Sequence, residues 1–383
     1  MKIIADENIP CVEQAFASLG EVSLLPGRGM RPEHVADADI LLVRSVTRVD
    51  ESLLAGSSVK FVGSATIGFD HVDRGYLSRQ GTGFATAPGS NATSAAEYVV
   101  SALLVLAEQQ GFELSDMRVG IIGFGNVGSR VYSKLSALGM TCLVNDPPLQ
   151  AQGGPGDFTN LDAVLQTDIV TVHVPYTRTG QWPTHHLVDR QLLGKLGTST
   201  LLINTSRGAV ADNDALDQWL DTHPDVSVVL DVWEGEPAIN LKLMNKVALA
   251  TPHIAGYSLD GKLRGTDMIY QAACDYFSRP VSWRAADVLP DRPTIELDEV
   301  SQADRVRAAV LSCYDVRADD ARLRKIAGQA VSDRSVFFDR LRKEYPVRRE
   351  FSEVNVVCNT ASTELQHTLS GLGFDLSKPV VSG

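Results

Sequence analysis

Short apolar runs alternate with longer amphipathic stretches through the first part of the chain. The runs "KIIAD", "ILLVRS" and "KFVGSAT" lie between residues 2 and 66, and helical stretches separate them. This rhythm is typical of a parallel sheet whose connecting helices cover its faces. A long helix, over residues 92–110, is expected to follow.

After this helix the rhythm restarts, with "TCLVND", "TDIVTVHVP", "STLLINTSRG", "VSVVLDVW" and "VALATPH". Two α/β units joined by the helix are therefore predicted. Another helix, from Leu259 to Phe277, is expected to end before Pro280, since proline breaks the helical pattern. Beyond it, "QADRVRAAVLSCY" and "SVFFDRLRKEY" have a helical period and "VNVVC" is a clear strand. These last hundred or so residues predict a separate α+β domain.

Composition argues against several classes of function for this chain. The formal net charge of −12 disfavours non-specific binding to nucleic acid, and an anionic substrate would need a locally placed arginine. The most apolar segment, "YVVSALLVLA", is about half as long as a membrane span, so it predicts a buried helix. Five scattered cysteines without a CxxC pair argue against a disulfide framework or a metal site. With no signal-peptide core at "MKIIADENIP", a cytoplasmic protein is expected.

The segment "VGIIGFGNVGSR" places a glycine-rich turn between an apolar run and a helical pattern. Gly123 allows a tight turn, Gly125 allows a pyrophosphate to approach the backbone, and Gly128 allows the helix to pack on the strand. The pyrophosphate would lie at the helix N-terminus around Asn126 and Val127. A structural turn is the alternative, but strand, turn and helix are all in the expected order.

The acid Asp146 ends the next apolar run, "TCLVND". There a carboxylate can bind both hydroxyls of an adenosine ribose and repel a 2′-phosphate. The pattern therefore predicts NAD as the cofactor in preference to NADP.

Three more apolar runs end in polar residues: Arg207 in "LLINTSRG", Glu236 in "LDVWEGEP" and His253 in "ATPHIAGY". In a doubly wound sheet the carboxyl ends of the strands meet beside the nucleotide. Oxidation of a 2-hydroxy acid needs a base, a cation for the carboxylate and an acid that orients the base, and these are the three residue types present. Each also has a structural alternative, as a capping charge, a turn acid or a packed histidine.

The ordered set "GFGNVG", "VHVP", "NTSRG", "DVWEGEP" and "TPHIAGY" resembles the D-isomer-specific 2-hydroxyacid dehydrogenase family. The resemblance covers roughly the first 280 residues. It implies a Rossmann-type NAD domain inserted in a flavodoxin-like α/β substrate domain, with a C-terminal α+β dimerisation domain after them. The implied boundaries are residues 1–91 and 256–281 for the substrate domain, 92–255 for the NAD domain and 282–383 for the third.

The resemblance also assigns roles to individual residues. It implies that Arg207, Glu236 and His253 are catalytic, and that Ser45, Thr66 and Tyr257 bind substrate. Around NAD it implies, beyond the glycine-rich turn, Asp146, Pro175, Ser206, Arg207, Gly208, Asp231 and Gly256. Segments such as "KFVGSATIGFDHVD" and "YPVRREF" are closest to members with a phosphorylated substrate. Arg44 and His71 are candidate phosphate partners by charge, although a solvent-facing role suits each equally.

Two other functions fit the family resemblance. One is a dehydrogenase for another 2-hydroxy acid, such as 3-phosphoglycerate. The other is a non-catalytic, NAD-binding corepressor-like protein, against which the acidic body and the folded C-terminal region weigh. The helix-period apolar faces of that region predict a homodimer, with no nucleic-acid or membrane partner.

Overall fold

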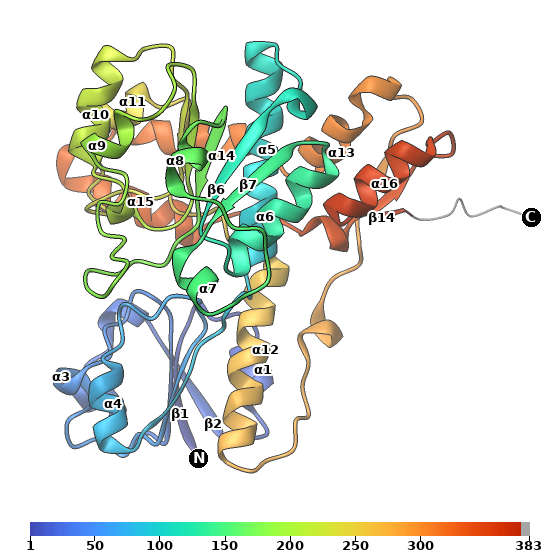
Figure 1. Ribbon diagram of the computed structural model, residues 1–383. Helices are drawn as coiled ribbons and strands as arrows, with labels where there is room; N and C mark the ends of the chain where they lie inside the picture. The colour runs from blue at the N-terminus through green and yellow to red at the C-terminus, as the bar shows by residue number, and fades with distance from the viewer. Residues whose placement is uncertain (377–383) are drawn as a thin grey trace, which may run out of the picture. The chain divides into compact units, whose positions relative to one another are not determined.

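The computed structural model describes residues 1–376, which fall into two compact units (Figure 1). The first contains Met1–Asn91 and Ser258–Asp291, and the second contains Ala92–Tyr257 with the chain from Arg292 onward. The C-terminal region thus shares a compact unit with the nucleotide-binding region. The division into three domains stays a prediction, because one compact unit can contain more than one folding domain.

The first unit is built on a five-stranded sheet in the order β2-β1-β3-β4-β5. Its strands are β1 Lys2–Asp6, β2 Glu21–Leu25, β3 Ile40–Val43, β4 Phe61–Ser64 and β5 Gly83–Ala85. All neighbouring pairs are parallel. This is the flavodoxin-like strand order, so the predicted fold class is confirmed for this unit.

Alternate side chains of these strands enter two different cores, because successive residues of a strand point to opposite faces. Ile3 and Ile40 pack with α1 Val12–Phe16 and α12 Leu259–Tyr276. Ile4 and Leu41 pack with helices on the other face (Figure 1). Those helices are α2 Pro32–Val35, α3 Glu51–Leu54 and α4 Arg74–Gln80.

The second unit contains a six-stranded parallel sheet in the order β11-β10-β9-β8-β6-β7. Its strands are β6 Arg118–Ile122, β7 Thr141–Asn145, β8 Ile169–Val172, β9 Leu201–Asn204, β10 Val228–Leu230 and β11 Leu249–Ala250. A single parallel bridge joins Val144 of β7 to Phe158. With Phe158 in the place of a third strand, the sheet has the 3-2-1-4-5-6 order of the Rossmann fold, and β11 adds a seventh position beside β10.

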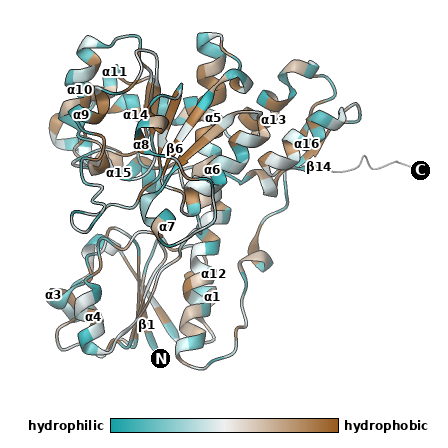
Figure 2. Ribbon diagram, in the orientation of Figure 1, coloured by the Kyte–Doolittle hydropathy of each residue, from teal (hydrophilic) through white to brown (hydrophobic). Residues whose placement is uncertain are grey.

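Both faces of this sheet are covered, as its nearly continuous apolar strands require. Figure 2 shows apolar colouring concentrated on the strands around β6. The helices of this region are α5 Ala92–Gln110, α6 Asn126–Ala137, α7 Pro147–Ala151, α8 Leu161–Leu165, α9 Arg190–Leu193, α10 Asn213–Thr222 and α11 Leu241–Lys246. The helix predicted over residues 92–110 is α5, which is buried along most of its length.

The C-terminal region has the α+β character predicted for it. Its parallel strands are β12 Thr294–Glu296, β13 Asn355–Val357 and β14 Asp375–Leu376. Its helices are α13 Arg305–Cys313, α14 Val316–Arg324, α15 Arg334–Lys343 and α16 Thr363–Leu372. Phe351 packs in the core beside α5, and Phe338 packs in the core on the other side of the second sheet. Among residues 1–376, no helix is long and apolar enough to cross a membrane.

Candidate functional site

The glycine-rich turn after β6 has the geometry that a bound pyrophosphate requires. Gly123 has a positive φ of 94°, and a Cβ on Gly128 would lie 1.9 Å from the Gly123 carbonyl oxygen. A Cβ on Gly125 would meet no atom within 4 Å. Asn126 and Val127 form the first turn of α6, whose N-terminal amides attract anions. The turn therefore has no room for a side chain at Gly128, where strand and helix pack, and it has open space at Gly125, where a phosphate would approach.

Asp146 follows β7 and is the N-cap of α7. Its Oδ1 accepts a hydrogen bond from the Leu149 amide at 2.9 Å, and its Oδ2 accepts one from the Phe124 amide at 2.7 Å. Both bonds fix the carboxylate beside the glycine-rich turn. Each oxygen keeps a further lone pair, so the group can still accept from ribose hydroxyls.

The segment after β9 carries Ser206, Arg207 and Gly208. Asn204 holds Ser206 through its Oδ1, which accepts from both the Ser206 amide and its hydroxyl. Arg207 is half-buried, and its Nη1 donates to the Ser206 carbonyl at 2.7 Å. A Cβ on Gly208 would lie 1.9 Å from the carbonyl oxygen of Trp233, so only glycine fits there. This close approach brings the ends of β9 and β10 together.

His253 and Glu236 form the pair predicted from the sequence. The His253 Nδ1 lies 2.8 Å from the Glu236 Oε2, and the Trp233 amide donates to the Glu236 Oε1 at 2.7 Å. Burial alone would raise the pKa of Glu236, but the neighbouring His253 outweighs it, so the pKa is lowered. An ionised Glu236 accepts the Nδ1 proton and leaves the Nε2 of His253 as the proton acceptor.

The backbone at His253 is unusual, with a φ of 57° in the left-handed region. Asp231 holds this conformation: its carboxylate accepts hydrogen bonds from the amides of Ile254 and Ala255, and its carbonyl accepts one from the His253 amide. Burial raises the pKa of the Asp231 carboxyl. Strained backbone of this kind is found at functional sites, where surrounding contacts enforce it. In this structure Asp231 holds the loop that carries His253.

Another histidine, His173, also follows a strand of this sheet, but its surroundings differ. Burial lowers the pKa of His173 to about 3, and its two ring nitrogens lie within hydrogen-bond distance of Thr171 and Thr205. The side chain of His253 is 32% exposed and has only one ring nitrogen in a described hydrogen bond. His173 therefore has a structural role, whereas His253 can exchange a proton.

Three more of the predicted site residues lie on loops of the same unit. Pro175 follows β8, and its carbonyl accepts a hydrogen bond from Thr184 at 2.5 Å. Gly256 lies in the loop between His253 and Tyr257, where the Tyr257 amide donates to the Ile254 carbonyl. Tyr257 stands edge-on to Tyr345 of the C-terminal region, with ring centroids 5.5 Å apart.

Ser45 and Thr66 belong to the first unit, in the segments after β3 and β4. Ser45 is exposed. The Thr66 hydroxyl lies 2.7 Å from that of Ser64 and donates to the Gly68 carbonyl, and Ser64 also lies 3.1 Å from the His71 Nε2. His71 thus takes part in this hydroxyl network, and Arg44 also has partners in the structure.

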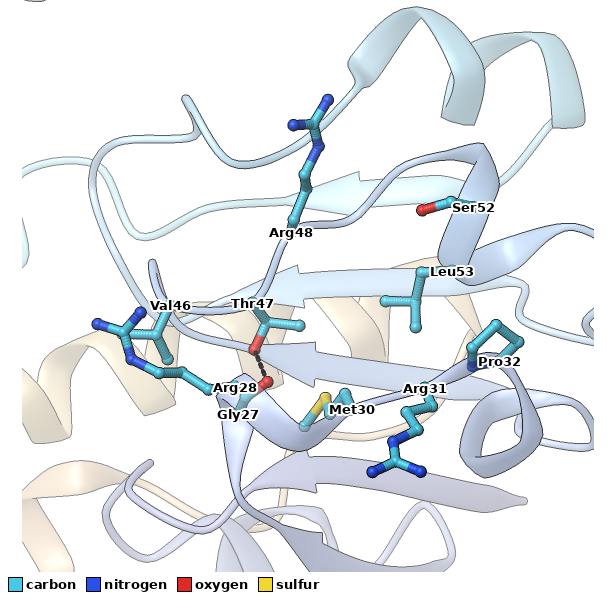
Figure 3. A pocket seen from close by; sticks show the side chains of 10 residues that line it. All are labelled: Gly27, Arg28, Met30, Arg31, Pro32, Val46, Thr47, Arg48, Ser52 and Leu53. Atoms are coloured by element: carbon cyan, nitrogen blue, oxygen red, sulfur yellow. Dashed lines mark hydrogen bonds between the residues drawn. The ribbon is translucent and has the colours of Figure 1, made fainter.

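A pocket of about 490 Å³ lies in the first unit, next to the segment that carries Ser45 (Figure 3). Its lining includes Arg28, Arg31 and Arg48, and the Thr47 hydroxyl donates to the Gly27 carbonyl across its floor. Arg31 pairs with Glu33 at 3.7 Å and Arg48 with Asp50 at 2.6 Å. Because Arg31 and Arg48 already have acidic partners, the pocket is a weak candidate for an anionic substrate.

Sequence reasoning missed two arginines of the C-terminal region that reach the loop between His253 and Tyr257. Arg348 donates to the Ala255 carbonyl at 3.1 Å, and the guanidinium carbon of Arg342 lies 5.8 Å from the centre of the Tyr257 ring. Arg348 lies in "YPVRREF", and Arg342 lies in the helical segment "SVFFDRLRKEY". Neither segment indicates by itself which loop it meets.

Comparison with known proteins agrees with the fold and the glycine-rich turn. Residues 92–255 match the NAD-binding domain of the D-isomer-specific 2-hydroxyacid dehydrogenases, and residues 289–373 match a domain of unknown function. The structure is similar to an NAD-dependent formate dehydrogenase from Staphylococcus aureus in complex with NAD. That match has a TM-score of 0.61 and 25% identity, over 74% of this chain and 97% of the other. The protein is an NAD-dependent oxidoreductase of the 2-hydroxyacid dehydrogenase class.

Relatives with similarity along the whole chain narrow the class further. The erythronate-4-phosphate dehydrogenase of Marinobacter nauticus is 48% identical over 98% of this chain and 100% of its own length. That of Proteus mirabilis is 47% identical over 98% of this chain and 99% of its own. The chain therefore belongs to the erythronate-4-phosphate dehydrogenase family.

Proposed function

We propose that the protein oxidises 4-phospho-D-erythronate to 2-oxo-3-hydroxy-4-phosphobutanoate with NAD, a step in the synthesis of pyridoxal 5′-phosphate (vitamin B6). The observation that carries the proposal is the His253–Glu236 pair, 2.8 Å apart in the unit that contains the glycine-rich turn. The full-length similarity to erythronate-4-phosphate dehydrogenases supports this choice of substrate.

In the proposed reaction His253 is the general base. Its Nε2 takes the proton of the substrate's 2-hydroxyl while Glu236 holds the ring through Nδ1 and stabilises the imidazolium that forms. Arg207 holds the substrate carboxylate and polarises the forming carbonyl, since a guanidinium binds a carboxylate through two parallel hydrogen bonds. NAD, when bound, accepts the hydride from the same carbon.

The cofactor contacts proposed are those of the glycine-rich turn for the pyrophosphate and Asp146 for the ribose hydroxyls. Pro175, Ser206, Gly208, Asp231 and Gly256 are proposed to line the rest of the NAD site. Of these, Asp231 acts through the loop it braces, because its described hydrogen bonds go to that loop and to Thr251. Ser45, Thr66 and Tyr257 are proposed to contact the substrate.

We also propose that the protein is a cytoplasmic homodimer and that the C-terminal region provides the contact. Val331, Val336 and Val347 are 77%, 69% and 75% exposed in the single chain, an apolar surface that a second copy would cover. Truncation is a poor test, since Phe338 and Phe351 of this region complete the cores of the second unit. Sedimentation of the full chain should give a dimer that Val336→Glu weakens; a monomeric unmodified chain would refute the assignment.

Steady-state assays of NAD reduction test the function. The purified protein should use 4-phospho-D-erythronate with a higher kcat/KM than D-erythronate, D-lactate or 3-phosphoglycerate, because a distal dianion adds binding energy that can act at the reacting carbon. A preference for one of the other acids would replace the proposed substrate. No reduction with any of them would favour the corepressor-like alternative.

A further inference from the structure

Arg342 is a cation of the C-terminal region that lies against a proposed substrate-binding residue. It is the penultimate residue of α15, and its guanidinium carbon lies 5.8 Å from the centre of the Tyr257 ring. Tyr345 packs on the same ring edge-on. The side chain of Tyr257 is therefore held between two residues of a segment far from it in sequence.

One nitrogen of Arg342, the buried Nε, has no hydrogen-bond partner among residues 1–376. Burial alone would lower the pKa of Arg342, but Tyr257, which shares a hydrogen bond with it, and the nearby carboxylates of Glu236 and Asp339 raise it. Glu236 already binds the Trp233 amide and His253. Because an arginine carries five donors, this guanidinium can bind a further anion.

Arg348 of the same region also has a buried Nε without a described partner, but its terminal nitrogens are used structurally. Its Nη1 donates to the Ala255 carbonyl at 3.1 Å and its Nη2 to the Ser94 carbonyl at 2.6 Å, while its guanidinium carbon lies 3.5 Å from the centre of the Tyr314 ring. Both terminal nitrogens are committed to main-chain carbonyls. Arg348 thus fixes the loop that contains Ala255 and Tyr257, and Arg342 meets that loop where it is already fixed.

We propose that Arg342, together with Tyr257, binds the anionic group that the substrate carries away from its reacting carbon. This inference rests on the proposed function. It gives the C-terminal region, which matches a domain of unknown function, a direct part in selecting a phosphorylated substrate. An arginine suits this task because its planar donors match phosphate oxygens.

The test compares two substrates in the full-length protein. Arg342→Gln should lower kcat/KM for 4-phospho-D-erythronate by about 10- to 100-fold, the loss expected for one charge-assisted hydrogen bond. D-erythronate should lose less than about 2-fold, because it lacks the group that Arg342 would bind. Arg342→Lys should recover part of the loss. The matched control is Arg340→Gln on the same helix, where the exposed Arg340 lies over Phe337; it should behave as the unmodified protein.

The outcomes separate a binding role from a structural one. Equal losses with both substrates would mean that Arg342 only supports the loop, and unchanged kinetics would remove it from the site; either result overturns the proposal. If the unmodified protein fails to oxidise the phosphorylated acid, the proposed function fails. Calorimetry of the NAD-loaded protein with inorganic phosphate then decides the role of Arg342. If the unmodified protein binds phosphate and Arg342→Gln weakens that binding, the role of Arg342 is supported. If phosphate does not bind, or binds equally to both proteins, the role is refuted.

Discussion

The first strand has equivalent neighbours in the parallel sheets of the two units, but the residues at its end differ between them. In the first sheet β1 lies between β2 and β3, and in the second sheet β6 lies between β7 and β8. After β6 the chain turns through Gly123, Gly125 and Gly128, and a Cβ at Gly125 would meet open space. In the first unit β1 itself ends in Asp6, which is fully buried and accepts hydrogen bonds from the amide and side chain of Asn8.

This difference indicates that the turn, and not the strand order, decides whether an anion can approach the end of the first strand. A Cβ on Gly27 would lie 2.2 Å from the Asp6 Oδ2, so the chain itself fills the region beside β1. A buried carboxylate would also repel a phosphate. Two sheets with similar strand orders therefore differ in whether an anion can approach the first crossover.

The other strand ends continue this contrast. In the second unit they carry Arg207, Glu236 and His253, whereas β3 and β4 of the first unit are followed by Ser45 and Thr66. Charged groups can move a proton and hold a carboxylate, but hydroxyls mainly position a ligand. Substitutions in the second unit should therefore affect turnover most strongly.

The largest effect is expected for His253→Asn. Loss of the general base should lower kcat by about 10²- to 10⁴-fold, while the Kd for NAD, measured by fluorescence titration, stays nearly unchanged. The exposed His367 on α16 provides the control, since His367→Asn removes a histidine with no part in the site. Near-normal turnover in His253→Asn would return the residue to a structural role.

The next largest effect tests the open turn. Gly125 has a negative φ of −74° and a Cβ there would meet no atom within 4 Å, so Gly125→Ala should fold. Its methyl group would occupy the space where the pyrophosphate approaches, and the Kd for NAD should rise about 10-fold or more. Gly128→Ala, whose Cβ would overlap the Gly123 carbonyl, should instead lower the melting temperature. Unchanged NAD binding in Gly125→Ala would show that the open space is not used.

A smaller effect is expected in the filled turn of the first unit. Asp6→Ala removes the acceptor for the Asn8 amide and should lower the free energy of unfolding by about 1–3 kcal/mol, measured with urea. The Kd for NAD should not change. Glu7→Ala, at the adjacent exposed position, controls for the loss of charge. Weaker NAD binding in Asp6→Ala would mean that the two turns do not differ in function as we infer.

The sequence predicted those structural features that depend only on residues close together in the chain. The bounds of α5 and the glycine-rich turn followed from periodicity and spacing, since each is fixed within one segment. The single bridge at Phe158 has no such pattern, because one residue does not show a strand's alternation. Arg342 and Arg348 could not be placed either, because tertiary packing alone brings them to a loop about 90 residues earlier in the chain.

The smallest effect concerns acid stability and separates Glu236 from the hydroxyl residues of the first unit. Burial tends to raise the pKa of Glu236, but His253 lowers it below the usual value of a glutamate. When the folded-state pKa is the lower one, the stabilisation is fully present above the unfolded pKa of about 4.3 and is lost as pH falls through the folded pKa. Glu236→Gln should therefore lower the free energy of unfolding above about pH 5, by at most about 1 kcal/mol because the His253 side chain is partly exposed. Below about pH 4 the difference from the unmodified protein should shrink, and Thr66→Val, which removes no charge, should show no such pH dependence. Urea unfolding between about pH 3 and 7 measures the free energy of unfolding of both variants. If the loss of stability in Glu236→Gln stayed constant on acidification, that result would contradict an ionised Glu236 paired with His253.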